Sequence, residues 1–224
     1  MTMTLGVLIG LLAQGRMARA DAAVTTIVAL GDSTTAGAPG FRSPLEAPPE
    51  GSGDPQSQYA YWLTLHHPEW RVLNRGVSGQ RTDEILARFT TDVIAASPQI
   101  VIILAGVNDL HQGKPVGWVT KYLARMYAQA HRAHIVVVAC SILPYDAATD
   151  EVRRRMKDAN DWIVEYTQTH PGMLFCDTAR SVEHTAYPGR LISTTDGLHP
   201  DVAAYRMLGS ALAGVLEQAL DPTR

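Results

Sequence analysis

The sequence predicts an open α/β fold, in which helices cover both faces of a parallel β-sheet. Three observations carry this prediction. Apolar, β-branched segments recur along the chain, amphipathic helical patterns lie between them, and three of the apolar segments are almost uninterrupted. Uninterrupted apolar segments are typical of strands that are buried on both faces, and alternation of strands with helices favours right-handed crossovers within one sheet.

Five segments are predicted to form the strands of this sheet. In chain order they are residues 26–30, 71–73, 100–104, 135–139 and 173–176. Each is short, rich in β-branched or other apolar side chains, and followed by polar or glycine-containing residues. We therefore expect a five-stranded parallel sheet.

Helical spacing of apolar side chains separates the later strands. It extends from 119 to 130, from 152 to 166, and from 205 to 215, where Asp221-Pro222 is expected to stop the last helix. Thr149 is predicted to be the N-cap of the second of these helices, because Asp150 and Glu151 follow it. Pro200 suits a first helical position, which makes His199 the expected N-cap of the last helix.

The long stretch 34–58 is rich in proline and glycine and shows no helix or strand pattern. Loops of this length within compact domains are usually functional or disordered. Because the stretch follows the first strand directly, we expect it at the carboxyl edge of the sheet, where open α/β folds bind ligands.

Length and composition exclude several classes of protein. The 224 residues suit one domain, which we place at 21–224, and 46% hydrophobic with 18% charged residues is an ordinary globular composition. The 19 basic and 22 acidic residues give a net charge of −3 without a basic block, so neither nucleic acid nor an anionic membrane is an expected partner. Cys140 and Cys176 lack zinc-site spacing and are predicted to be buried free thiols.

The first twenty residues are set apart from the predicted domain. Residues 5–13 are apolar, too short to span a bilayer but of the length found in signal peptides, and Ala18 and Ala20 suit a cleavage site before Asp21. No lysine or arginine precedes Leu5, so a disordered tail is the alternative. We expect residues 1–20 to be a signal peptide of a secreted or periplasmic protein, or, failing that, a tail of a cytoplasmic one.

Polar and glycine residues collect immediately after the predicted strands. Gly31-Asp32-Ser33 follows the first strand, the turn 74–79 the second, and the segment 106–109 the third. In a parallel sheet these turns share one edge, and a late segment, 196–200, adds a carboxylate and an imidazole three residues apart. Serine, histidine, aspartate and backbone donors are the ingredients of acyl transfer through a covalent intermediate.

Three serines are candidates for the nucleophile. Ser78 lies in a near match to the G-x-S-x-G elbow, but Gln80 replaces the last glycine, and Ser141 lacks a flanking glycine. Ser33 lies in a tight polar turn that can expose its hydroxyl. Ser33 is therefore the preferred nucleophile, while Asp32 and Asp109 are expected to order the loops around it.

Together, these blocks resemble the SGNH, or GDSL-type, serine hydrolases, a family of esterases and acylhydrolases. The resemblance covers residues 27 to about 216, and Thr34 replaces the usual leucine after the serine. It implies a flavodoxin-like three-layer α/β/α fold with strand order 2-1-3-4-5, a small-molecule ester as substrate, and neither cofactor nor metal.

The resemblance also implies the roles of individual residues. Ser33 attacks the carbonyl carbon, His199 transfers the proton, and Asp196 orients the imidazole. The oxyanion is bound by the backbone N–H groups of Ser33 and Gly76 and by the side chain of Asn108.

Other functions remain open at this stage. The same site suits an acyltransferase or a carbohydrate acetylesterase. A flavodoxin-like FMN-binding module would use hydroxyl groups after the first strand to bind phosphate, but it gives the Asp196/His199 pair no purpose. A metal hydrolase lacks a third ligand at a sensible spacing.

Overall fold

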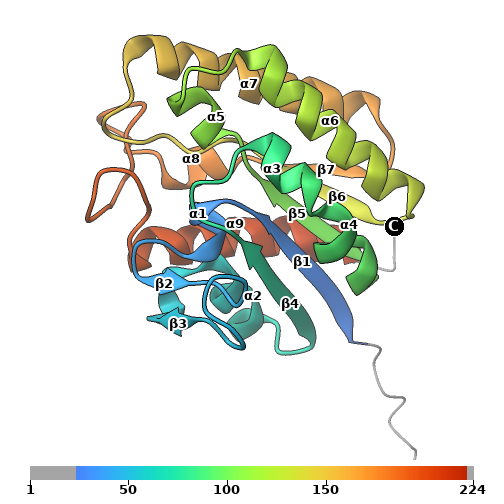
Figure 1. The fold of residues 1–224 in the computed structure, drawn as a ribbon. Helices are drawn as coiled ribbons and strands as arrows, with labels where there is room; N and C mark the ends of the chain where they lie inside the picture. Colours follow the sequence, from blue (N-terminus) through green and yellow to red (C-terminus); the bar gives the residue numbers. More distant parts are fainter. Residues whose placement is uncertain (1–23, 221–224) are drawn as a thin grey trace, which may run out of the picture.

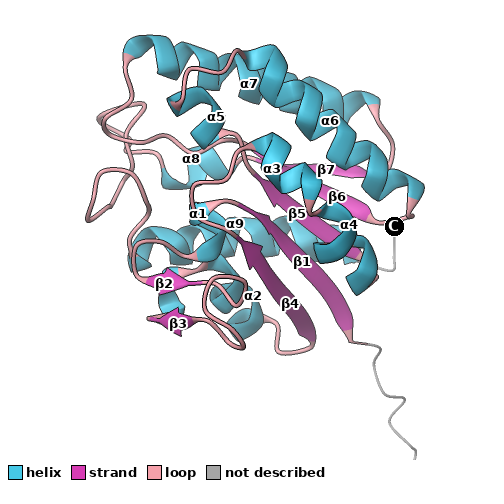
Figure 2. Ribbon diagram, viewed as in Figure 1, coloured by secondary structure: helices cyan, strands magenta, loops and turns pink. Residues whose placement is uncertain are grey.

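The computed structural model describes residues 24–220. A five-stranded parallel sheet lies at its centre, with helices on both faces (Figure 1, Figure 2). The strands are β1 (Thr25–Gly31), β4 (Trp70–Gly76), β5 (Ile100–Leu104), β6 (Val136–Cys140) and β7 (Met173–Cys176). The predicted α/β class is confirmed, and all five predicted strands form.

The strand order is β4-β1-β5-β6-β7. Numbered among themselves along the chain, these strands follow the expected order 2-1-3-4-5. The labels skip two numbers because a small antiparallel ribbon, β2 (Phe41–Arg42) and β3 (Ser52–Gly53), lies within the stretch 34–58 that was predicted to be irregular. Its strands are only two residues long, too short to leave an alternating pattern.

Each strand of the sheet sends alternate side chains to opposite faces, and two apolar cores result. On β1, Val28 and Leu30 join one core, and Ile27 and Ala29 join the other. The first core is covered by α3 (Thr82–Ala87), α4 (Phe89–Asp92), α6 (Val116–Arg132) and α7 (Asp150–Thr169). The second is covered by α2 (Tyr59–His66), α8 (Thr178–Val182) and α9 (Val202–Leu220).

The remaining short helices lie in the connections. They are α1 (Ser33–Ala36), η1 (Pro55–Ser57), η2 (Ile94–Ala96) and α5 (Val107–His111). Two of them, α1 and α5, begin directly after the carboxyl ends of β1 and β5. The sheet therefore places both at the edge where the sequence concentrates its polar residues.

The helix starts confirm one prediction and correct another. Thr149 is the N-cap of α7, and its Oγ1 accepts a hydrogen bond from the N–H of Val152 at 3.3 Å. The last helix was expected to begin at Pro200 with His199 as its N-cap. Instead α9 begins at Val202, and Asp201 Oδ1 accepts from the N–H of Ala204 at 3.0 Å, so the stronger capping side chain sets the boundary.

Cys140 and Cys176 are buried and free, as predicted, on the adjacent strands β6 and β7. The expected signal peptide at residues 1–20 lies outside the described residues. Within residues 24–220, no helix combines the length and the hydropathy needed to cross a bilayer.

Candidate functional site

Ser33 lies at the carboxyl end of β1, as the first residue of α1. The carboxylate of Asp32 accepts a hydrogen bond from the N–H of Thr34 at 3.0 Å, which fixes the tight turn from strand to helix. Ser33 itself is 8% exposed. The sheet and this turn thus hold the serine hydroxyl at the edge of the core.

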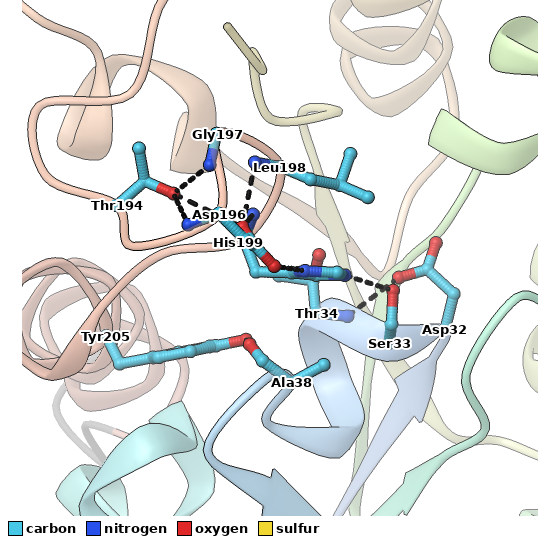
Figure 3. A network of polar contacts seen from close by, with 10 residues as sticks. All are labelled: Asp32, Ser33, Thr34, Ala38, Thr194, Asp196, Gly197, Leu198, His199 and Tyr205. Carbon is cyan, nitrogen blue, oxygen red and sulfur yellow. Dashed lines mark hydrogen bonds and ion pairs between the residues drawn. The ribbon is translucent and has the colours of Figure 1, made fainter. Parts of the chain in front are cut away.

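His199 and Asp196 reach Ser33 from the opposite end of the sequence (Figure 3). His199 Nε2 lies 2.9 Å from Ser33 Oγ, and its Nδ1 lies 2.7 Å from Asp196 Oδ2. The contact between Ser33 and His199 joins residues 166 positions apart. The structure therefore brings the three predicted residues into one continuous hydrogen-bonded line.

Asp196 is held as an ionised group. Burial raises its pKa, but hydrogen bonds from the His199 ring and from the backbone N–H groups of His199 and Leu198 outweigh that effect and lower the pKa to about 2. Those N–H groups donate to Oδ1 at 2.8 and 2.9 Å, which leaves Oδ2 for the imidazole. The carboxylate is thus charged at neutral pH and fixed in orientation.

The loop that carries this pair has few buried side chains and is held by local hydrogen bonds. Thr194 Oγ1 accepts from the N–H groups of Gly197 and Asp196, at 2.9 and 3.3 Å. The N–H of Asp146 donates to the carbonyl of Gly197 at 2.8 Å, which ties this loop to the one that follows β6. Polar contacts, more than packing, therefore position the histidine.

Asn108 lies on α5, after the carboxyl end of β5, and lines the cavity that contains Ser33. Its Nδ2 donates to the carbonyl of Gln80 at 3.0 Å, and this bond uses one of the two amide hydrogens. The neighbouring Asp109 is fully buried and accepts from the N–H and the hydroxyl of Thr82 at 2.9 and 2.7 Å. Asp109 thus orders the Asn108 loop, as predicted.

Gly76 does not occupy the place that the sequence suggested. Its N–H donates to Asn74 Oδ1 at 2.9 Å, and a Cβ at this position would lie 2.0 Å from the backbone nitrogen of Ala36. Gly76 is therefore required for close packing of β4 against α1. Its amide is already engaged, so we no longer assign it as an oxyanion donor.

Gly79, in the same turn, offers a backbone N–H that the sequence did not single out as an oxyanion donor. Its φ of +78° favours glycine, and among residues 24–220 its N–H has no hydrogen-bond acceptor. It directly precedes Gln80, whose carbonyl accepts from Asn108. A second glycine in the segment 76–79 was the available signal, but the sequence alone does not say which amide is free.

Arg88 was also missed, and it joins several parts of the site. Its guanidinium donates to the carbonyl groups of Gly31 and Arg75 at 2.8 Å each, and to Gln80 Oε1 at 2.7 Å. It also pairs with Asp92 at 2.6 Å, and both side chains are largely buried. Arg88 therefore links the carboxyl ends of β1 and β4 to the turn that contacts Asn108.

Asp32 is buried beside this network. Burial raises its pKa from 3.8 to about 7; the hydrogen bond from Thr34 and the charge of Arg88 oppose the rise, whereas the charge of Asp109 adds to it. No hydrogen bond joins it to His199. Its contact with Thr34 agrees with the prediction that Asp32 orders the turn around Ser33.

The cavity at Ser33 is small, about 20 Å³. Ser33, Asn108 and His199 line it together with apolar side chains. The apolar lining comprises Leu104, Ala105, Val107, Ile142, Leu143, Pro144 and Leu198. The cavity is narrow and mostly apolar, so it suits a small group next to the serine hydroxyl.

The other candidate serines have different surroundings. Ser141 is 1% exposed; its hydroxyl donates to Asp177 Oδ1 at 3.0 Å and accepts from the N–H of Ala179 at 2.8 Å. Ser78 is exposed, and its N–H donates to Glu46. Neither serine lies next to an imidazole, so Ser33 is the only one of the three with a base beside it.

The alternative of an FMN-binding module finds no support in this geometry. The hydroxyl groups that would bind a phosphate after β1 belong to Ser33, Thr34 and Thr35, which are 8%, 6% and 0% exposed, and the Ser33 hydroxyl is in contact with His199. Thr35 Oγ1 also lies in hydrogen-bond contact with the hydroxyl of Tyr59 at 3.1 Å. Within residues 24–220, no group of three or more histidine, cysteine or acidic side chains is arranged to hold a metal ion.

Comparisons with known proteins find a matching family model and a related esterase. The model of the GDSL-like Lipase/Acylhydrolase family matches residues 29–207. An acetylxylan esterase from Geobacillus stearothermophilus is 26% identical over 156 residues, which are 63% of this chain and 69% of that protein. The region that the family model matches includes Ser33, Asn108, Asp196 and His199.

Solved structures show the same fold. A member of the lipolytic protein G-D-S-L family from Veillonella parvula has a TM-score of 0.73 at 17% identity, and the match covers 87% of this chain and 99% of that one. A catalytic mutant of an acetylxylan esterase from Geobacillus stearothermophilus has a TM-score of 0.64 at 25% identity, covering 86% and 94% of the two chains.

Proposed function

Because the chain belongs to the GDSL-like lipase/acylhydrolase family and is a carboxylic ester hydrolase, we propose that it cleaves esters of short acyl groups through an acyl intermediate on Ser33. The observation that carries this proposal is the line of contacts from Ser33 Oγ through the His199 ring to Asp196, at 2.9 and 2.7 Å. A nucleophile, a base and an orienting carboxylate in this order support acyl transfer.

In the first half-reaction, Ser33 Oγ attacks the ester carbonyl carbon while His199 Nε2 takes the hydroxyl proton. The tetrahedral intermediate collapses, the bond to the alcohol oxygen breaks, and His199 returns the proton to that oxygen. In the second half-reaction, His199 removes a proton from water, which attacks the acyl-serine. The acid leaves, and Ser33 recovers its proton.

Asp196 makes His199 an effective base. With Nδ1–H donating to Oδ2, the imidazole presents an unprotonated Nε2 to Ser33. The carboxylate also stabilises the imidazolium that forms during each half-reaction. Because its pKa is lowered to about 2, it stays charged throughout the neutral pH range.

Three donors are assigned to the oxyanion. They are the N–H of Ser33, which begins α1 and has no intrahelical acceptor, the free hydrogen of Asn108 Nδ2, and the N–H of Gly79. None of the three carries a formal charge, so they stabilise the developing negative charge without an ion pair to the serine. Loss of one such donor costs about 10²- to 10³-fold in rate.

The size of the cavity beside Ser33 supports a short acyl group. The narrow cavity bounded by Leu143, Pro144 and Leu198 suits an acyl group of few carbons, whereas a long chain would have to displace these side chains. We therefore expect acetate esters to be better substrates than octanoate esters.

A chain-length series tests the proposal. We expect kcat/KM for p-nitrophenyl acetate to exceed that for the octanoate by about tenfold or more, because overfilling a packed site costs about 1 to 3 kcal/mol. Ser33→Ala should lose on the order of 10⁴-fold on the acetate. Retention of most of the activity by Ser33→Ala would refute the acyl-serine, and a preference for octanoate would refute the short acyl group.

Covalent labelling provides an independent readout. An ethyl phosphonate with a p-nitrophenyl leaving group should add one ethylphosphonyl group to the chain, detected on the Ser33 peptide by mass spectrometry. Ser141→Ala is the matched control, because it removes a buried serine that has no imidazole nearby. This variant should still be labelled, whereas Ser33→Ala should not.

Acetylated xylan is a second candidate substrate. Two observations favour it: the similarity to an acetylxylan esterase and the small cavity beside the serine. Acetate release from acetylated xylan, compared between the wild type and Ser33→Ala, tests it. Adding a simple alcohol to the same assay distinguishes hydrolysis from acyl transfer, since a transferase would form the new ester in place of free acid.

A further inference from the structure

A larger cavity of about 440 Å³ lies next to the cavity at Ser33. The two share Ile142 and Pro144 as lining residues. The remaining walls of the larger cavity come from α7 and from the segment between Asp177 and Gly189 that contains α8. Ile142 and Pro144 therefore form a wall common to the larger cavity and the cavity that contains Ser33.

Basic side chains outnumber acidic ones in this cavity. Arg153, Lys157 and Arg180 line it, against Asp177 and Glu183. This excess is local, because the chain as a whole carries a net charge of −3. Because Lys157 is paired with Asp161, the side chains that can attract an anion here are Arg153 and Arg180.

Both carboxylates are already engaged by donors other than these basic side chains. Asp177 Oδ1 accepts from the Ser141 hydroxyl at 3.0 Å and from the N–H of Arg180 at 3.2 Å. Glu183 Oε1 accepts from the N–H of Gly189 at 2.6 Å. Neither acid forms an ion pair with a basic side chain of the cavity.

Two of the three cations are without an acidic partner among residues 24–220. Arg153 Nη2 donates only to the carbonyl of Asp146 at 3.2 Å, and its Nε is buried without an acceptor. The exposed side chain of Arg180 makes no hydrogen bond or ion pair within the same residues. Lys157 differs, because it pairs with Asp161 at 2.5 Å. Two guanidinium groups that lack an acidic partner among residues 24–220 and line one cavity are suited to a carboxylate, phosphate or sulfate.

We propose that this cavity binds an anionic oxygen group on the alcohol portion of the ester substrate, with Arg180 and Arg153 as its ligands. The inference rests on the proposed function, because it assigns the small cavity beside Ser33 to the acyl group. The alcohol portion then has to extend elsewhere, and the larger cavity beyond Ile142 and Pro144 is open to it. The substrate class is thus the short-chain ester of an anionic alcohol.

Matched pairs of acetate esters test the proposal. One member of each pair carries a carboxylate, in 4-acetoxybenzoate and in 3-(4-acetoxyphenyl)propanoate, and the other carries the corresponding neutral amide. The two lengths sample the reach from Ser33 to the arginines. We expect one carboxylate ester or the other to exceed its amide in kcat/KM by about tenfold, mainly through a lower KM, since a charge-assisted hydrogen bond contributes that much.

Variants assign this preference to the cavity. In Arg180→Gln the ratio of carboxylate to amide should fall by about tenfold, and in Arg180→Glu it should fall below one. Arg154→Gln is the matched control, because Arg154 is exposed on the same helix as Arg153 but does not line the cavity. This control should keep the wild-type ratio. Sulfonate and phosphate analogues of the preferred ester then distinguish the kind of anion.

Two results would overturn the anion site. One is a wild-type ratio near one for both lengths and for the sulfonate and phosphate analogues. The other is a ratio that falls equally in Arg180→Gln and Arg154→Gln. Hydrolysis of the acetate esters that carry the neutral amide tests the esterase activity by itself, because it depends on Ser33 and not on Arg180. The proposed esterase can therefore stand while the anion site fails, and calorimetry of 4-acetoxybenzoate with Ser33→Ala measures binding when no turnover occurs.

Discussion

The two sides of the candidate active site are held in place by different forces. Ser33 follows a strand buried on both faces and begins a helix whose four residues are all buried. His199 and Asp196 lie on an irregular loop, where the Asp196 side chain is 35% exposed and hydrogen bonds provide most of the support. The nucleophile is thus positioned by the core and the base by local polar contacts.

This difference separates stability from activity. A change beneath Ser33 disturbs buried strands and charges, so it should change the free energy of unfolding. A change in the loop that carries His199 removes few buried contacts, so it should lower the rate with little change in that free energy.

The largest effect is expected for His199→Ala. Without the base, kcat/KM for p-nitrophenyl acetate should fall on the order of 10⁴-fold, equivalent to about 5 kcal/mol of transition-state stabilisation. The free energy of unfolding, measured with urea, should change by less than about 1 kcal/mol. His66→Ala, at an exposed position on α2, is the control and should keep both values. A loss of less than about tenfold would remove His199 from the mechanism.

Asp32→Asn tests the buried side of the site, next to Ser33, through the pH dependence of the free energy of unfolding. The pKa of Asp32 is 3.8 when unfolded and about 7 when folded, so protonation favours the folded state. Its stabilising contribution is fully present below about pH 4 and is lost as the pH rises through about 7. Asparagine stays neutral and can still cap Thr34, so the variant should match the wild type near pH 4. By about pH 8 it should exceed the wild type by up to about 4 kcal/mol.

Urea unfolding of both proteins across this pH range provides the measurement. Asp54→Asn is the control: Asp54 Oδ1 also caps a helix, accepting from the N–H of Gln56 at 2.9 Å, but at an exposed site. It should give no pH-dependent gain. If the difference between Asp32→Asn and the wild type is constant with pH, Asp32 does not titrate as its burial requires.

Arg88→Met tests the links beneath Ser33. The substitution keeps a long apolar side chain but leaves Asp92 and two carbonyl groups without their buried donor. We expect a loss of about 3 kcal/mol in the free energy of unfolding, together with a roughly tenfold lower kcat. The control Arg155→Met removes an exposed pair with Glu151 and should cost less than about 1 kcal/mol. Equal losses of unfolding free energy in the two variants would show that the buried contacts of Arg88 stabilise the fold no more than an exposed ion pair does.

Much of this architecture could be predicted because it depends on local signals. Buried strands leave uninterrupted apolar segments, and the carboxyl ends of parallel strands share an edge, so Ser33 and Asn108 could be assigned to one site from their positions. His199 and Asp196 were recognisable from their spacing and from the family resemblance. The fold class and the five strands were predicted from these local signals, whereas the strand order was predicted from the family resemblance.

The remaining features depend on contacts that the sequence does not display. Arg88 reaches Gly31, 57 residues away, and an arginine in the turn between two short helices is ordinarily a surface residue. Gly76 and Gly79 are equally plausible as backbone donors until the Asn74 side chain is seen to occupy one of the two amides. The N-cap of α9 was misplaced because Pro200 is a weaker signal than the carboxylate of Asp201.

The smallest effect is expected for Thr194→Val, on the loop side of the comparison. Valine preserves the shape but removes the acceptor of the Gly197 and Asp196 N–H groups, so the carboxylate that orients His199 gains freedom. We expect kcat to fall by about three- to tenfold with little change in KM. The free energy of unfolding should fall by no more than about 1 kcal/mol. Thr194→Ser restores the hydroxyl and should recover most of the rate. If Thr194→Ser is slow while Thr194→Val keeps the wild-type rate, the threonine methyl group, and not its oxygen, supports this loop.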